Sequence, residues 1–207
     1  MNLSLYLITD SREMSGEEFF RTIEMAVSSG VTMVQLREKE LSSREFFERA
    51  LRLKKICAAQ NVPLIINDRV DIAIAANADG VHLGTSDLPI SIARKILGEG
   101  KIIGATAKTA DAAVKAAHDG ADYFGIGAFF ATGTKSDAYT MTPDEIRAVT
   151  DIAPIPAVGI GGLTYENLDI IKNSGVKGAA ISDAIMRAKD VAKTVRLLRE
   201  KVDKLTR

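Results

Sequence analysis

Short apolar runs rich in β-branched residues recur along the whole chain, and a segment with helical periodicity follows each of them. The runs are continuous rather than alternating in polarity, which is typical of parallel strands that are buried on both faces. The eight runs cover residues 3–9, 31–37, 63–67, 80–84, 102–107, 123–130, 155–161 and 178–182. The pattern therefore predicts eight strand–helix units in succession.

Helix-start and helix-stop signals lie between these runs. Glycines near positions 30, 120 and 175 are placed to end three of the helices. The third helix, expected at about 69–77, has the weakest pattern. Three pairs have the spacing of a capping box, namely Ser15 with Glu18, Ser42 with Glu45, and Thr142 with Glu145, the last followed by Pro143 at the first helical position.

Eight such units in 207 residues, without a linker or a low-complexity tract, favour an α/β protein with a single (β/α)8 TIM-barrel domain over residues 1–207. The alternative is an open doubly wound sheet. If that sheet bound a dinucleotide, it would need a glycine-rich turn after its first strand, and residues 7–16 supply none.

Composition narrows the class of partner. The chain has 27 basic and 27 acidic residues, so no global field points to nucleic acid or to acidic lipid. No apolar run approaches ~18 residues, the length needed to span a membrane. A single cysteine, Cys57, excludes an internal disulfide and fits a helical core face. The first ten residues lack the basic region of a signal peptide, so we expect a cytoplasmic protein, as a monomer or as a homo-oligomer.

The active site of such barrels lies at the C-terminal ends of the strands, where chemistry-bearing residues are concentrated here. After the second run, Gln35, Arg37 and Lys39 alternate, so all three point to one side of an extended backbone. Two cations and an amide at a barrel mouth predict an oxyanion ligand. The alternative is that Arg37 and Lys39 pair with Glu38 and Glu40 at the rim.

Acidic residues end the next two strands. Asp68 follows the third run and Asp87 follows the fourth. Each alone is explained as a helix cap, but two acids facing a basic cluster also suit Mg²⁺ bound together with a polyphosphate. His82 is better explained as a hydrogen-bonded barrel histidine, and His118 as a helix-end residue. A Ser–His triad and a zinc site built from His and Cys therefore have no support.

The remaining strand ends are polar and rich in glycine. Thr106 and Lys108 end the fifth strand, and Gly159, Gly161 and Gly162 end the seventh. Loops after the seventh and eighth strands are the usual phosphate site of such barrels, although these glycines could simply turn the strand into a loop. The mouth is therefore predicted to hold two anionic groups with a metal near one. The other polar ends are Thr132, Gly133, Thr134 and Lys135 after the sixth strand, and Ile181 with Ser182 after the eighth.

Seven segments, in order along the chain, resemble the thiamine-phosphate synthase family from the first strand to the last helix. Each segment alone is a weak signal, but the combination is specific. The segments are YLITD, VQLREK, LIINDRVDIA, ADGVHLGTSDLP, GADYFGIGAFFATGTK, AVGIGGL and GAAIS.

The resemblance implies a Mg²⁺-dependent transfer that joins hydroxymethylpyrimidine diphosphate to hydroxyethylthiazole phosphate and releases pyrophosphate. A dissociative path through a pyrimidine carbocation is expected, without a general base, and Arg37, Lys135 and Thr106 are its expected catalytic residues. Asp68 and Asp87 are implied to bind the metal. The residues implied to bind the pyrimidine diphosphate are Gln35, Leu36, Arg37, Glu38, Lys39, Asn67, Thr106 and Lys135, and those implied to bind the thiazole phosphate are Thr132, Gly133, Thr134, Gly162, Ile181 and Ser182.

This chain departs from the family pattern at several positions. Thr106 replaces the usual serine and Lys108 the usual histidine, so a hydroxyl remains for the diphosphate with an added methyl group. Ala128 and Ala131 stand where the family has prolines, and Gly133 adds flexibility to its loop. These departures bear on rate and substrate fit more than on the class of reaction.

Two rival functions remain on the same barrel. A thiazole tautomerase, which isomerises a thiazole carboxylate phosphate, would not need a diphosphate and metal site. A non-enzymatic phosphate-binding barrel would keep the glycine-rich loops but has no reason to keep both Asp68 and Asp87. The acid pair and the basic cluster therefore favour the synthase.

Overall fold

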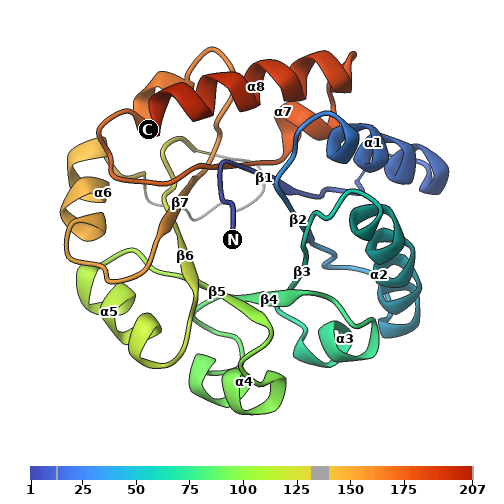
Figure 1. Ribbon diagram of the computed structural model, residues 1–207, viewed down its shortest axis with the longest axis horizontal. Helices are drawn as coiled ribbons and strands as arrows, with labels where there is room; N and C mark the ends of the chain where they lie inside the picture. The colour runs from blue at the N-terminus through green and yellow to red at the C-terminus, as the bar shows by residue number, and fades with distance from the viewer. Residues whose placement is uncertain (13, 132–139, 207) are drawn as a thin grey trace.

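Eight parallel strands form a closed barrel in chain order, as the sequence predicts, with the helices outside the ring (Figure 1). The computed structural model describes residues 1–12, 14–131 and 140–206. Pairing of β1 with β8, with Leu5 opposite Ala179, closes the ring. The strands are β1 (Leu5–Ile8), β2 (Met33–Leu36), β3 (Leu64–Asn67), β4 (Gly80–Leu83), β5 (Ile102–Thr106), β6 (Tyr123–Ile126), β7 (Ala157–Ile160) and β8 (Ala179–Ile181).

Helical segments connect the strands, and the predicted caps are present at several of them. The predicted boxes of α2 and α6 are complete, whereas Ser15 accepts only the Glu18 N–H at the start of α1. A 3₁₀ turn, η1, stands between β7 and β8. The segments are α1 (Gly16–Ser28), α2 (Ser43–Ala58), α3 (Val70–Ala75), α4 (Ile90–Leu97), α5 (Ala110–His118), α6 (Pro143–Thr150), η1 (Leu168–Ile171), α7 (Asp183–Met186) and α8 (Val191–Leu205).

Alternation along each strand creates two apolar layers. On β1, Leu5 and Leu7 pack outward against the helices, while Tyr6 and Ile8 point into the barrel. Leu3, just before β1, joins the inner cluster, and the N-terminus lies over the middle of the ring in Figure 1. The interior is therefore filled with apolar side chains towards the strand starts, which leaves the strand ends for polar groups.

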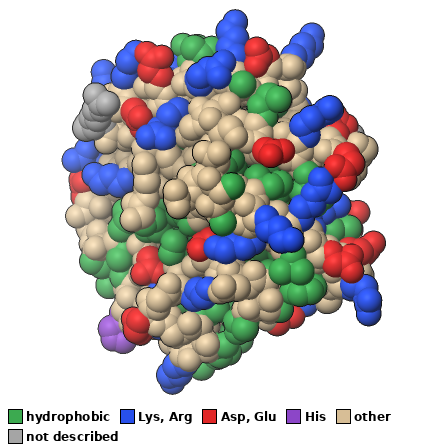
Figure 2. Space-filling model, turned by 45° about the vertical axis from the view of Figure 1, so that its right-hand side comes forward, with side chains coloured by type: hydrophobic (Ala, Val, Ile, Leu, Met, Phe, Trp, Pro, Cys, Tyr) green, Lys and Arg blue, Asp and Glu red, His purple; other side chains and the backbone are tan. Residues whose placement is uncertain are grey.

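The outer surface carries mixed charge. Lysine, arginine, aspartate and glutamate side chains of both signs are interspersed over the face drawn in Figure 2, in keeping with the balanced composition. None of the helices in the described part of the chain is long and apolar enough to cross a bilayer.

Candidate active site

The basic segment after β2 presents an amide and two cations at the barrel mouth. Gln35 lies on an inward position, 2% exposed, and its Nε2 donates to Tyr6 Oη at 2.8 Å. The Arg37 backbone N–H is fixed by Thr9 Oγ1 at 3.1 Å, and its half-buried guanidinium has no hydrogen-bond or ion-pair partner among the described residues. Arg37 thus offers an uncommitted bidentate donor.

The two residues that alternate with Gln35, Arg37 and Lys39 face away from the mouth. Leu36 is fully buried in the layer between strands and helices. The Glu38 side chain is 4% exposed, accepts Ser11 Oγ at 2.8 Å and forms an ion pair with Arg49 at 2.5 Å. Contact of Leu36 or Glu38 with a ligand would therefore use their backbone atoms. The Arg49 pairing also removes Glu38 as a rim partner for Arg37.

Asp68 and Asp87 are neighbours, although they follow different strands. Their carboxyl groups share a hydrogen bond, and the Lys39 ammonium forms an ion pair with Asp68. Neither acid caps a helix, because the first residues of α3 and α4 are preceded by Arg69 and Pro89, which make no side-chain cap. The capping explanation for both acids is therefore wrong.

The backbone holds each acid in position. Asp68 adopts a left-handed conformation, φ 63°, which aspartate tolerates better than most residues, and its N–H donates to the His82 carbonyl at 2.9 Å. Asp87 Oδ2 accepts the Gly84 N–H at 2.6 Å across the loop after β4. Both carboxylates are therefore preorganised side by side.

Because the two carboxyl groups lie side by side, their pKa values shift in opposite directions. Burial and then the hydrogen bond with Asp68 raise the pKa of Asp87 above its usual value. Burial also opposes ionisation of Asp68, but hydrogen bonds with Lys39 and Asp87, together with the charge of Lys39, outweigh it and lower its pKa. Opposite shifts are expected of two carboxyl groups that compete for one proton. A divalent cation would relieve the same repulsion.

The carboxylates of Asp68 and Asp87 fit a hard cation whose other ligands are water and substrate oxygens. Within the described ranges, no group of three or more Asp, Glu, His or Cys side chains is gathered as a metal cage. Mg²⁺ usually keeps several waters and binds through one or two carboxylates together with substrate phosphates. Asp68 and Asp87 therefore suit a magnesium ion that arrives with a diphosphate.

Asn67 and Thr106 complete this side of the mouth. Asn67 ends β3 and is 8% exposed, without a side-chain hydrogen bond to any residue that the structure describes. Thr106 ends β5, half-buried, with Oγ1 3.2 Å from His82 Nε2. His82 is a hydrogen-bonded barrel histidine, as predicted, because its Nδ1 also lies 3.1 Å from Tyr123 Oη.

Glycines and one hydroxyl form the opposite side. Gly161 and Gly162 follow β7 with φ of 106° and 59°, and a Cβ on either would lie within 3 Å of the segment after β6. Asn167 fixes this loop by donating to the Gly162 carbonyl at 2.9 Å. After β8, the buried Ser182 Oγ has no hydrogen-bond partner among the described residues, whereas Ile181 points into the outer layer.

Thr132, Gly133, Thr134 and Lys135 lie outside the described residues. The segment that leads to them is anchored on the glycine loop, since the Phe129 N–H donates to the Ile160 carbonyl at 3.0 Å and the Phe130 N–H to the Gly161 carbonyl at 3.1 Å. Beyond the gap, the Met141 N–H donates to the Ala128 carbonyl at 2.8 Å. Both flanks of the predicted loop thus return to the barrel mouth.

Sequence reasoning missed a buried carboxylate after β1. Asp10 is 3% exposed and pairs with Arg12 at 2.5 Å and with Arg187 of the α7 end at 3.1 Å. The Arg12 hydrogen bond, against the opposing effect of burial, lowers the pKa of Asp10. Its place directly after the first predicted strand was the available signal. Through Arg187, Asp10 ties the end of β1 to the end of α7.

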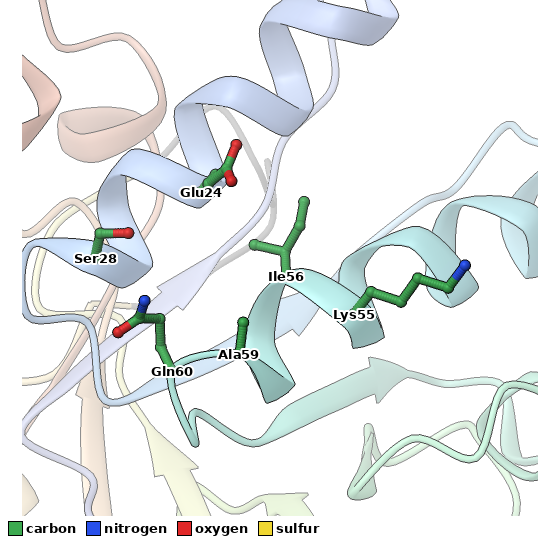
Figure 3. Close-up of a pocket in the computed structure, with 6 residues that line it drawn as sticks. All are labelled: Glu24, Ser28, Lys55, Ile56, Ala59 and Gln60. Carbon is green, nitrogen blue, oxygen red and sulfur yellow. The ribbon is translucent and has the colours of Figure 1, made fainter.

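A hollow on the opposite side of the molecule has a different character. It measures about 240 Å³ and is lined by the C-terminal turns of α1 and α2, as Figure 3 shows for Glu24, Ser28, Ile56 and Gln60. Helices in this barrel run against the strands, so these turns lie at the strand starts, away from the mouth. The ionisable residues among those that line the hollow are Glu24 and Lys55.

Comparison with known proteins agrees with this geometry. The family model described as thiamine monophosphate synthase matches residues 5–185. A thiamine-phosphate synthase of Clostridium botulinum (strain Eklund 17B / Type B) is 47% identical over 205 residues, covering 99% of this chain and 96% of the relative. One from Alkaliphilus oremlandii is 46% identical over 202 residues, covering 98% and 97%.

A solved structure gives the same assignment. A thiamine phosphate pyrophosphorylase from Pyrococcus furiosus superimposes with a TM-score of 0.89 at 35% identity, covering 98% of this chain and 96% of that one. The likeness extends over nearly the whole chain. On the family match and these near full-length relatives, the chain belongs to the thiamine-phosphate synthase family.

Proposed function

We propose that this enzyme condenses hydroxymethylpyrimidine diphosphate with hydroxyethylthiazole phosphate to give thiamine phosphate and pyrophosphate, with Mg²⁺ bound at Asp68 and Asp87. The observation that carries the proposal is the pairing of two unlike anion-binding surfaces at one barrel mouth. One is built from charged side chains after β2, β3 and β4, and the other from glycine backbone and the Ser182 hydroxyl after β7 and β8.

The diphosphate belongs to the charged side in this proposal. Arg37 is the donor for a bidentate contact, Lys39 is a second cation beside Asp68, and the Thr106 hydroxyl and Asn67 amide are further hydrogen-bonding groups. Asp68 and Asp87 would hold Mg²⁺, which would supply positive charge against the leaving diphosphate. Preorganised positive charge of this kind stabilises a departing anion.

The proposed step breaks the bond between the pyrimidine methylene carbon and the diphosphate oxygen. The electron pair leaves with pyrophosphate, and the pyrimidine amino group stabilises the cation that remains. The thiazole nitrogen then donates its lone pair to the methylene carbon and forms the new C–N bond. No proton is transferred, so the enzyme needs to position the thiazole rather than to supply a base.

The thiazole phosphate belongs to the glycine side. The exposed backbone of Gly162 suits a phosphate at this part of a barrel. The buried, unpartnered Ser182 Oγ is a hydroxyl that a phosphate oxygen would satisfy. Thr132, Gly133, Thr134 and Lys135 remain proposed contacts, on the basis of the family resemblance.

A reducing cytoplasm is the proposed location. The single cysteine is a buried free thiol, and burial raises the pKa of Cys57 to about 12. Such a thiol is inert and requires no oxidising compartment.

The testing experiment measures pyrophosphate release from hydroxymethylpyrimidine diphosphate, with and without hydroxyethylthiazole phosphate, in Mg²⁺ and in EDTA. Release that requires both substrates and the metal, together with thiamine phosphate formation, is the expected result. Absence of release while the thiazole phosphate still binds would overturn the proposal and indicate a tautomerase or a binding protein. Undiminished release in EDTA would overturn the metal assignment alone.

A further inference from the structure

A continuous chain of hydrogen bonds crosses the barrel interior between two of the proposed substrate-binding residues. It begins at Gln35 on β2, passes through Tyr6 and Tyr123, and reaches Thr106 on β5 through His82. The links are Gln35 Nε2 to Tyr6 Oη at 2.8 Å, Tyr6 Oη to Tyr123 Oη at 2.8 Å, Tyr123 Oη to His82 Nδ1 at 3.1 Å, and His82 Nε2 to Thr106 Oγ1 at 3.2 Å.

The Gln35 amide fixes the direction of donation along this chain. Since Nε2 donates to Tyr6 Oη, the remaining described partner for the Tyr6 hydroxyl proton is Tyr123. Tyr123 then donates its own proton to His82 Nδ1. A neutral imidazole that accepts at Nδ1 carries its proton on Nε2, and that proton is donated to Thr106 Oγ1.

Burial makes the chain a unit. Burial is the largest cause that raises the pKa of Tyr6 and of Tyr123, so both phenols keep their protons. Gly104 makes room for the second ring, because a Cβ there would lie 2.2 Å from Tyr123 Cζ. An unpaired hydroxyl in this interior would cost free energy, and each member is therefore held by its neighbours.

We infer that this chain of hydrogen bonds sets opposite hydrogen-bonding polarities at its two ends, Gln35 and Thr106. Gln35 is left with Oε1 as an acceptor, to which no residue in the described part of the chain donates, and Thr106 is left with its hydroxyl proton as a donor. Tyr6, Tyr123 and His82 are positioning residues that act through these two ends.

The inference rests on the proposed function and adds substrate discrimination to it. An acceptor at Gln35 matches the pyrimidine amino group, and a donor at Thr106 matches a diphosphate oxygen. A pyrimidine with a carbonyl in place of that amino group would present an acceptor to an acceptor. The chain of hydrogen bonds therefore selects the aminopyrimidine diphosphate against its oxo analogue.

Tyr123→Phe breaks the chain at its centre while keeping the ring against Gly104. We expect kcat/KM for the pyrimidine diphosphate to fall about tenfold, with a similar loss of preference over the oxo analogue, because the amide and the histidine tautomer are no longer fixed. KM for the thiazole phosphate should stay within about twofold, since that ligand uses the glycine side. Tyr165→Phe, at a tyrosine 42% exposed on the surface, is the matched control.

Equal losses of kcat/KM for the pyrimidine diphosphate and for the thiazole phosphate in a folded Tyr123→Phe protein would overturn the inference. An unchanged preference for the aminopyrimidine diphosphate over its oxo analogue would overturn it as well. Tyr6→Phe, which breaks the neighbouring links, replaces it if Tyr123→Phe does not fold, with the same expected outcome.

Histidine tautomers give a readout that does not depend on turnover. The chain has two histidines, so His118→Gln leaves the imidazole ¹⁵N signals of His82 alone in the NMR spectrum. We expect a neutral His82 with its proton on Nε2, and loss of that fixed tautomer in Tyr123→Phe. A proton on Nδ1 in the native sequence would overturn the inference, even if other substrates replaced those proposed.

Discussion

The two sides of the barrel mouth meet anionic groups with different parts of the chain. After β2, β3 and β4, the site consists of charged side chains such as Arg37, Asp68 and Asp87. Hydrogen bonds that involve backbone N–H groups hold Arg37 and Asp87 in position. After β7, Gly161 and Gly162 carry no side chain, and Gly162 exposes its backbone instead. The charged side should therefore be sensitive to loss of charge, and the glycine side to gain of bulk.

The largest expected effect is on the charged side, at the metal. Asp87→Asn keeps an oxygen for the Gly84 N–H but removes the charge. We expect turnover at saturating substrates to fall about 10³-fold, because a misplaced metal forfeits several kcal/mol of transition-state stabilisation. Titration of turnover with Mg²⁺ measures it, and Asp111→Asn, at an exposed acid in the first turn of α5, is the control.

Normal turnover of Asp87→Asn at limiting Mg²⁺ would remove the metal from this pair of acids. A large loss in Asp111→Asn would instead assign the effect to general surface charge. The same titration with the native protein fixes the metal requirement against which both variants are compared.

Arg37 tests whether geometry matters in addition to charge. Arg37→Ala should lower turnover about 10²-fold, comparable to the loss of one preorganised donor, and Arg37→Lys about tenfold because lysine keeps the charge without the planar fork. The measurement is kcat for pyrophosphate release, which should be highest in the native protein, lower in Arg37→Lys and lowest in Arg37→Ala. Equal activity of Arg37→Lys and the native protein would reduce Arg37 to a point charge.

The residues of the charged side could be predicted from the sequence because their type and their position after the strands both indicate a site. Arg37, Asp68 and Asp87 directly follow apolar runs, and parallel strands bring those ends to one rim. Strand limits were less well predicted. The run 123–130 ends as a strand at Ile126, since Gly127 turns to a φ of 152° and residues 128–130 fold onto the loop after β7.

The interior hydrogen bonds could not be predicted in the same way. Tyr6 and Tyr123 stand in apolar runs where phenylalanine would give an identical pattern. Their hydroxyls meet across the barrel, 117 residues apart in sequence, only because the ring closes. The unpartnered state of the Ser182 hydroxyl likewise depends on which groups surround it in three dimensions.

On the glycine side, Gly162→Ala adds a single methyl group. The new Cβ would lie 2.8 Å from Phe130 Cβ, at a φ of 59°. We expect KM for the thiazole phosphate to rise about 30-fold, because relief of the clash and strain displaces the loop by a few tenths of an ångström or more. KM for the pyrimidine diphosphate should change by less than about threefold.

Gly16→Ala is the matched control, since nothing lies within 4 Å of a Cβ at that position in α1. If Gly162→Ala raised both KM values equally, the two sides of the mouth would not be separate binding surfaces. A rise confined to the pyrimidine diphosphate would exchange the two assignments.

The smallest expected effect separates binding from stability on the glycine side. Ser182→Ala removes a buried hydroxyl that has no partner among the described residues, so the free energy of unfolding should rise by about 1 kcal/mol and Tm by about 2–4 °C. Affinity for the thiazole phosphate should fall about fivefold, because the ligand loses one hydrogen bond. Thermal unfolding and calorimetric binding measure the two changes.

Ser174 supplies the opposite case a few residues upstream. Its hydroxyl is as well buried but donates to the Ile171 carbonyl at 2.7 Å, so Ser174→Ala should lower the free energy of unfolding by about 1 kcal/mol and leave binding unchanged. Opposite signs of stability change in the two serine variants would mark Ser182 as a group whose partner is the ligand. If Ser182→Ala destabilised the protein as Ser174→Ala does, the hydroxyl would be part of the scaffold, and the glycine loop alone would bind the phosphate.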